Sequence, residues 1–290
     1  MGRVPLSPGS LRTWCRLTVP RAPARMRLAP GEVHVWRLDL NVPETQVSEL
    51  NRTLDDDEQA RSARLAFKAD RSYFIAAHGL VRHVLSCYLG LMPDAVRYDR
   101  APRGKPRIRT GPRDTHLPLR FNVSSSDDTA LLAVSLDREV GVDIEVIRGE
   151  RDCMGIAERF FSPWETAALR RLGNQERIPA FYRCWARKEA YVKATGDGMF
   201  LPLDSFVVPV DPPGPPLTPE RPQPVFFSAG GAGRGRWTMI GVPEIAGFAT
   251  AVLVESGQVD YAHSRPERRQ PIARFLAVCP DRRREVGSAR

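Results

Sequence analysis

Two carboxylates two residues apart are the first feature of this sequence that could do chemistry. The run G-V-D-I-E occupies residues 141–145, and strand alternation would put Asp143 and Glu145 on one face, about 6.5 Å apart. Carboxylate oxygens so placed suit Mg²⁺, which completes its shell with water and phosphate oxygens. From these five residues alone, an ordinary strand with a solvated acidic face is the alternative interpretation.

A second group lies in the run F-Y-R-C-W-A-R-K-E-A-Y-V-K at residues 181–193. Helical geometry stacks Trp185, Glu189 and Lys193 on one side. Taken alone, this spacing predicts only a weak Glu-to-Lys ion pair on a surface helix. With a further acidic residue close by, it would complete a site for magnesium and phosphate.

Basic and hydroxyl side chains could supply further phosphate contacts. The run R-G-K-P-R at residues 103–107 lacks the P-loop pattern and is either a phosphate cradle or a solvated turn. Arg61, Arg64 and Lys68 fall on one helical face, and with Arg71 they extend such a cradle or merely solvate a helix. The run F-N-V-S-S-S at residues 121–126 is a strand that leads into hydroxyls. No G-x-S-x-G or H-E-x-x-H pattern is present, so serine-hydrolase and zinc-protease chemistry lack support.

Alternating and three-to-four apolar spacings predict the elements that position these groups. The predicted helices cover residues 55–67, 71–91, 155–161, a segment that begins at the S-P-W-E capping signal of residues 162–165, and 178–194. The predicted strands cover residues 33–38, 121–126, 130–136, 140–147, 203–210, 225–228, 237–242 and 248–254. This order indicates an α+β protein whose two halves meet near residues 120–140.

Charge separates the ends of the chain from its body. Of the formal charge of +9, six arginines without any acidic residue lie in residues 1–31, and eight arginines against three acidic residues lie in residues 264–290. The body is therefore slightly acidic, unlike a general nucleic-acid binder. We expect a disordered Arg/Pro-rich extension at 1–31, with a transit peptide as the alternative, halves at 32–130 and 131–263, a Pro-rich loop at 209–224 and an Arg-rich tail at 264–290.

Composition also indicates in which cellular compartment the protein is expected. The 5 cysteines are scattered and form no C-x-x-C pair, so neither a disulfide framework nor a zinc site is indicated. The longest apolar run, residues 245–254, is much shorter than the roughly 18 residues of a membrane-spanning helix. We expect a cytoplasmic protein that does not cross a membrane.

Taken in order, the motifs G-K-P, F-N-V-S-S-S, G-V-D-I-E, R-F-F-S-P-W-E, W-A-R-K-E-A-Y-V-K-A-T-G and L-P-L-D-S-F resemble the 4′-phosphopantetheinyl transferases of the surfactin-synthetase-activating type. The match spans roughly residues 55–210. The resemblance implies a pseudo-symmetric pair of α+β halves, each a small sheet packed with helices, with coenzyme A in the cleft between them and magnesium on its diphosphate.

The resemblance also implies roles for single residues. Asp143, Glu145 and Glu189 correspond to the family's metal-binding acids, and Lys193 to the lysine beside the diphosphate. In the reaction we expect Glu189 to act as general base, directly or through a metal-bound water. The implied coenzyme A contacts are Lys188, Lys105, Pro106, Ser124, Ser125, Arg61 and Arg71. The family commonly has histidine where this chain has Ser125. Loss of one charge-assisted contact there is expected to weaken coenzyme A binding.

The reaction that follows is attack by a carrier-protein serine on the β-phosphate of coenzyme A, with 3′,5′-adenosine bisphosphate released. The expected partners are acyl or peptidyl carrier proteins and coenzyme A, with no specific nucleic acid, and the enzyme is expected to act as a monomer. Two alternatives stay open. One is a pseudo-enzyme that binds coenzyme A or carrier protein, and the other is a nucleic-acid-binding protein that uses the arginine-rich ends.

Overall fold

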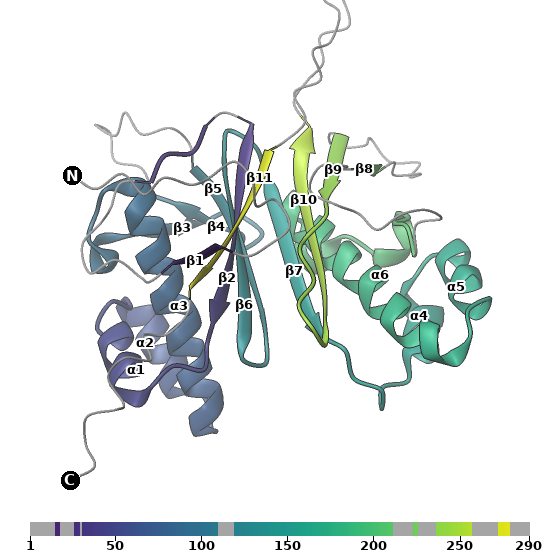
Figure 1. The fold of residues 1–290 in the computed structure, drawn as a ribbon, viewed down its shortest axis with the longest axis horizontal. Helices are drawn as coiled ribbons and strands as arrows, with labels where there is room; N and C mark the ends of the chain where they lie inside the picture. The colour runs from purple at the N-terminus through teal and green to yellow at the C-terminus, as the bar shows by residue number, and fades with distance from the viewer. Residues whose placement is uncertain are drawn as a thin grey trace, which may run out of the picture.

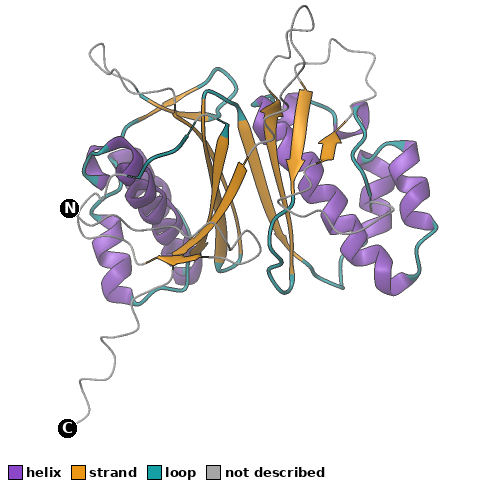
Figure 2. Cartoon of the chain, turned by 45° about the horizontal axis from the view of Figure 1, so that its top comes forward, coloured by secondary structure: helices purple, strands orange, loops and turns teal. Residues whose placement is uncertain are grey.

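The computed structural model describes residues 15–17, 26–29, 31–109, 119–210, 223–225, 236–256 and 272–278. It forms two α+β halves whose sheets face each other, with helices on the outer side of each sheet (Figure 1). Figure 2 shows the resulting layers, in which the two sheets separate one group of helices from the other. This arrangement confirms the predicted fold class.

The first half has a five-stranded sheet in the order β1-β11-β2-β6-β5. Its strands are β1 (Cys15–Leu17), β2 (Glu32–Asp39), β5 (Leu119–Ser126), β6 (Thr129–Leu136) and β11 (Ile272–Val278). Its helices are α1 (Glu44–Asn51), α2 (Asp56–Ala63) and α3 (Lys68–Leu89), followed by the short turn η1 (Pro93–Ala95). A separate two-stranded ribbon joins β3 (Tyr98–Arg100) to β4 (Pro106–Ile108).

The second half has a four-stranded sheet in the order β7-β10-β9-β8. Its strands are β7 (Val140–Val146), β8 (Gln223–Val225), β9 (Arg236–Ile240) and β10 (Phe248–Ser256). Its helices are α4 (Cys153–Phe160), α5 (Pro163–Arg170) and α6 (Asn174–Thr195), followed by the turns η2 (Gly198–Phe200) and η3 (Leu203–Ser205). As the S-P-W-E signal predicts, Ser162 and Glu165 form a capping box at the start of α5.

Apolar side chains fill three layers. One cluster lies between α3 and the first sheet and another lies between α6 and the second sheet. The third cluster lies between the two sheets and includes Val33, Val35, Val142 and Val252. The two halves therefore share a hydrophobic interface. Polar contacts between the halves can then fix how they lie relative to each other.

Some sequence predictions differ from this structure. The boundary at 130/131 falls inside β6, which pairs with β2, so the change of sheet comes between Leu136 and Val140. Residues 203–210 contain η3 and no strand, and α1 was not predicted. Strands β1 and β11 lie in the segments expected to be an extension and a tail, where charge and proline dominate the pattern. Residues 211–222 of the Pro-rich loop lie outside the described residues.

None of the helices in the described ranges combines the length and the apolar character that crossing a bilayer requires.

Candidate functional site

Strand β7 and helix α6 bring the predicted acids and lysine to one place. The apolar residues of β7 pack between the two sheets, so Asp143 and Glu145 lie on the opposite face. Gly141 permits close contact with α6, because a Cβ at this residue would lie 2.0 Å from the carbonyl oxygen of Ala190. Glu189 and Lys193 are one helical turn apart on α6, and both side chains lie on the side of the helix that faces these acids.

Asp143 is the centre of this group. Its Oδ1 accepts hydrogen bonds from Lys193 Nζ at 2.5 Å and from Ser124 Oγ at 2.8 Å. Lys193 Nζ also lies 2.8 Å from Ser124 Oγ. The carboxylate is 1% exposed, and Lys193 is its ion-pair partner. Lys193 therefore compensates a charge that burial would otherwise make very costly.

The three acids influence one another electrostatically. Burial raises the pKa of Asp143 above its ordinary value, against the opposing effect of Lys193. Burial, and after it the negative charge of Asp143, raises the pKa of Glu145 and of Glu189. Trp185, one turn before Glu189 on α6, hydrogen-bonds Glu145. Burial and the charge of Asp143 therefore both disfavour the ionised forms of Glu145 and Glu189.

The carboxylate oxygens of Asp143, Glu145 and Glu189 suit a hard divalent cation, although they are not already arranged as a metal site. Among the described residues, no three histidine, cysteine, aspartate or glutamate side chains are gathered as a metal site. Lys193 lies against Asp143 instead. However, Asp143 Oδ2 is buried without a hydrogen-bond partner in the described part of the chain. Because buried polar atoms normally have a partner, we expect a hydrogen-bond donor or a cation beside this oxygen. Carboxylate oxygens suit Mg²⁺.

The serine cluster of β5 is divided between two faces. The side chains of Asn122, Ser124 and Ser126 face β7, where Asn122 Oδ1 accepts from the Val142 N–H and Ser126 Oγ from the Val146 N–H. Ser124 is thus buried beside Asp143. Ser125 is exposed on the other face of the strand.

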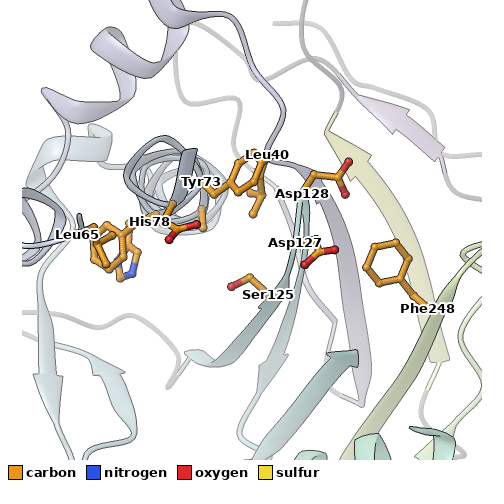
Figure 3. Close-up of a pocket in the computed structure, with 11 residues that line it drawn as sticks. Leu40, Leu65, Tyr73, His78, Ser125, Asp127, Asp128 and Phe248 are labelled. Carbon is orange, nitrogen blue, oxygen red and sulfur yellow. The ribbon is translucent and has the colours of Figure 1, made fainter. Parts of the chain in front are cut away.

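A cavity of about 650 Å³ opens where Ser125 points, between α3, the β5–β6 turn and the start of β10. Figure 3 shows Tyr73 and His78 entering it from α3 and Phe248 from the other half, with Ser125 and Asp127 between them. It combines aromatic walls with polar groups, as ligand cavities usually do. Its lining residues are Leu40, Leu65, Asp70, Tyr73, Phe74, Ala77, His78, Ser125, Asp127, Asp128 and Phe248.

Sequence reasoning missed the cavity residues of α3. His78 stacks on Phe74, with ring centroids 4.0 Å apart, and its Nδ1 lies 2.8 Å from Glu58 Oε1. Glu58 is in turn bound by the fully buried Arg82. The helical spacing of α3 correctly marked a buried face, but His78 and Phe74 lie at its half-buried margin. Apolar periodicity contains no signal that separates such a margin from the core.

Lys188 is buried and bound within the second half of the protein. Its side chain is 0% exposed, and its Nζ lies 2.7 Å from Glu165 Oε2 and donates to the carbonyls of Leu203 and Phe206. Helical geometry explains this placement, since a residue next to Glu189 points about 100° away from it. The implied contact of Lys188 with coenzyme A stays a prediction.

Lys105, whose implied nucleotide contact stays a prediction, is also bound within the protein. Its side chain is buried, and Nζ donates to Glu139 Oε2 at 2.8 Å, to the Val140 carbonyl at 3.0 Å and to the Ala194 carbonyl at 2.8 Å. Three acceptors use all three N–H donors of an ammonium group. Pro106, the first residue of β4, is half-buried beside it.

Arg61 and Arg71 are both exposed. The Arg61 guanidinium lies 5.2 Å from the ring centroid of Phe74, which puts it at the margin of the cavity. Arg71 Nη2 donates to the Leu65 carbonyl at 2.9 Å. Each guanidinium thus contacts a residue that lines the cavity, Phe74 for Arg61 and Leu65 for Arg71.

Comparison with known proteins gives consistent results over both halves. A family model described as the 4′-phosphopantetheinyl transferase superfamily matches residues 139–230, and a model of the N-terminal part of 4′-phosphopantetheinyl transferase matches residues 42–137. The two matched regions meet where β6 ends and β7 begins.

Curated relatives agree with these models. The chain is 40% identical to 4′-phosphopantetheinyl transferase HetI of Nostoc over 193 residues, 67% of this chain and 80% of that protein. It is 31% identical to 4′-phosphopantetheinyl transferase ffp of Bacillus subtilis over 192 residues, 66% of this chain and 82% of that protein. It is also 31% identical to the L-aminoadipate-semialdehyde dehydrogenase-phosphopantetheinyl transferase of Xenopus laevis over 167 residues, 56% of this chain and 55% of that protein.

Proposed function

Because this chain belongs to the 4′-phosphopantetheinyl transferase superfamily, we propose that it transfers the 4′-phosphopantetheine arm of coenzyme A to a serine of an acyl or peptidyl carrier protein. The serine oxygen bonds to the β-phosphorus, the bond from that phosphorus to the bridging oxygen breaks, and 3′,5′-adenosine bisphosphate leaves. The observation that carries this proposal is the meeting of Asp143, Glu189 and Lys193 between β7 and α6.

Each residue of this group has a proposed task. Asp143, Glu145 and Glu189 would hold Mg²⁺, which when bound withdraws charge from the diphosphate. Glu189 accepts the proton of the attacking serine, directly or through a metal-bound water. Lys193 places a positive charge beside the leaving phosphate oxygen. Ser124 orients the Asp143 carboxylate through its hydrogen bond.

The cavity next to this group is the proposed site for the nucleotide end of coenzyme A. Ser124 and Ser125 are neighbours on β5, so the cavity and the acidic group lie on opposite faces of one strand. Tyr73, Phe74 and Phe248 offer aromatic surface for a base, and Arg61 offers a cation at the margin. Phe248 belongs to the second half, so a ligand in this cavity contacts both halves.

We assign the reaction to a monomer in the cytoplasm. Cys87, Cys153 and Cys184 are buried free thiols, which is consistent with a reducing compartment.

The test of the proposal is mass spectrometry of a panel of apo carrier proteins incubated with the protein, coenzyme A and Mg²⁺. A carrier should gain the mass of one phosphopantetheine arm, and a serine-to-alanine carrier should gain nothing. If coenzyme A binds but no carrier gains mass, the chain is a pseudo-enzyme and the proposal is wrong.

Replacing Ser125 by histidine is expected to lower the dissociation constant of coenzyme A about tenfold, because a charge-assisted hydrogen bond to phosphate is added at the cavity wall. Isothermal titration calorimetry measures this. Ser48→His, on the exposed side of α1, is the matched control and should leave the affinity unchanged. Equal affinities of Ser125→His and wild type would show that no phosphate lies near residue 125.

A further inference from the structure

The buried Lys105 ammonium joins three segments that are distant in sequence. Lys105 lies in the turn between β3 and β4 in the first half. Its acceptors are Glu139 Oε2 and the Val140 carbonyl at the start of β7, and the Ala194 carbonyl in the last turn of α6. These contacts connect the first half to both elements that carry the acidic group.

The contact with α6 satisfies a backbone group that the helix itself leaves open. Carbonyls in the last turn of a helix lack an intrahelical N–H partner, and a cation there also interacts favourably with the helix dipole. The helix ends at Gly196, whose φ is +73°, and the Lys105 stem packs there, since a Cβ on Gly196 would lie 3.2 Å from Lys105 Cδ. The ammonium therefore caps the helix that bears Glu189 and Lys193.

The contact with β7 acts at the point where strand and helix touch. Gly141 follows Val140 directly, and a Cβ on Gly141 would lie 2.5 Å from the Ala194 nitrogen. Lys105 thus bonds the carbonyl of the residue before Gly141 and that of Ala194, on the two sides of this close approach. Asp143 lies two residues further along β7, and Lys193 one residue before Ala194.

Other contacts of the same turn reinforce this connection. Arg103 forms an ion pair with Asp197, two residues after α6, and its guanidinium lies 5.7 Å from the ring centroid of Phe200. Arg107 Nη2 lies 3.0 Å from Glu139 Oε1. All three basic side chains of the R-G-K-P-R run therefore bind the second half.

We propose that Lys105 is a positioning residue that holds the end of α6 against the start of β7 and so sets the distance between Lys193 and Asp143. The role rests on the proposed transferase function and gives the R-G-K-P-R turn a task other than nucleotide binding. Its side chain contacts no substrate, so it acts through Glu139 and the two carbonyls.

The experiment compares Lys105→Met, which keeps the stem and removes the ammonium, with wild type. We expect kcat for carrier modification to fall about a hundredfold, because small displacements of catalytic groups cost about that much. The KM for coenzyme A and the dissociation constant of 3′,5′-adenosine bisphosphate should stay within about threefold. Arg170→Gln, which breaks an exposed ion pair with Glu158, is the control and should leave all three unchanged.

Opposite results would overturn the proposal. If kcat is retained while the affinity for 3′,5′-adenosine bisphosphate falls more than about tenfold, the ammonium contacts the nucleotide. If Lys105→Met does not fold, the same kcat and nucleotide affinity are measured for Glu139→Gln, because this variant keeps the lysine and removes its anionic partner. A reduced kcat with unchanged nucleotide affinity supports the role, and an unchanged kcat refutes it.

A measurement without substrate separates this role from the transferase function. Urea unfolding of Lys105→Met, Glu139→Gln and the double variant should give non-additive changes, as expected of residues in direct contact. Additive changes would contradict the positioning role of Lys105 even if the enzyme is active. A wild-type protein that modifies no carrier would refute the transferase function while this coupling is still measured.

Discussion

The Glu189→Gln variant is expected to lose carrier modification by at least about a thousandfold, because it removes both a proposed general base and a proposed cation ligand. Its fold should be unaffected. Burial and the charge of Asp143 raise the pKa of Glu189, so the ionised carboxylate does not stabilise the folded state and the neutral amide fits at least as well. Single-turnover rates followed by carrier mass measure the loss, and thermal unfolding checks the fold.

Glu158→Gln provides the matched control. Glu158 is an exposed glutamate on α4 that binds only Arg170 among the described residues, and its replacement should leave the rate unchanged. A Glu189→Gln rate near that of wild type would refute both roles assigned to Glu189.

The Lys188→Met variant is expected to lower the free energy of unfolding by about 3–5 kcal/mol, because it leaves a buried carboxylate without its cation. Both side chains of the Lys188–Glu165 pair are 0% exposed. Loss of the ammonium also leaves the carbonyls of Leu203 and Phe206 without this donor. Urea unfolding measures the change.

The exposed pair of Arg170 and Glu158 again supplies the comparison, since Arg170→Gln should cost less than about 1 kcal/mol. Folded Lys188→Met should bind coenzyme A as wild type does. Undiminished stability together with weakened coenzyme A binding would instead support Lys188 as a ligand contact.

Local periodicity predicted the parts of the fold that depend on neighbouring residues. Alternation in β5, β6 and β7 and the spacing in α3 and α6 gave these elements to within a few residues. The strand predicted at 203–210 is wrong because its apolar residues pack on the second core while backbone carbonyls there bind Lys188. Strand β11 pairs with β2, far away in sequence, and no local pattern reports such a partner.

The candidate site, like the fold, could be predicted from the sequence only in part. Alternation places Asp143 and Glu145 on one face of a strand, and helical spacing aligns Glu189 with Lys193. Which faces meet depends on tertiary packing, including the close approach at Gly141. The side chains of Lys105 and Lys188 look like surface cations in the sequence, but the structure buries both against acceptors that are distant or on a neighbouring element.

The central claim is that the acids of β7 and α6 hold one divalent cation against the diphosphate of coenzyme A. Titration of Mn²⁺ into the coenzyme A complex by calorimetry tests it most directly, with Asp143→Asn as the paired variant and Glu158→Gln as the control. Wild type and control should each bind one ion per chain, and in Asp143→Asn the Mn²⁺ affinity should fall to that of coenzyme A alone. Equal Mn²⁺ affinity in Asp143→Asn and wild type would contradict this claim.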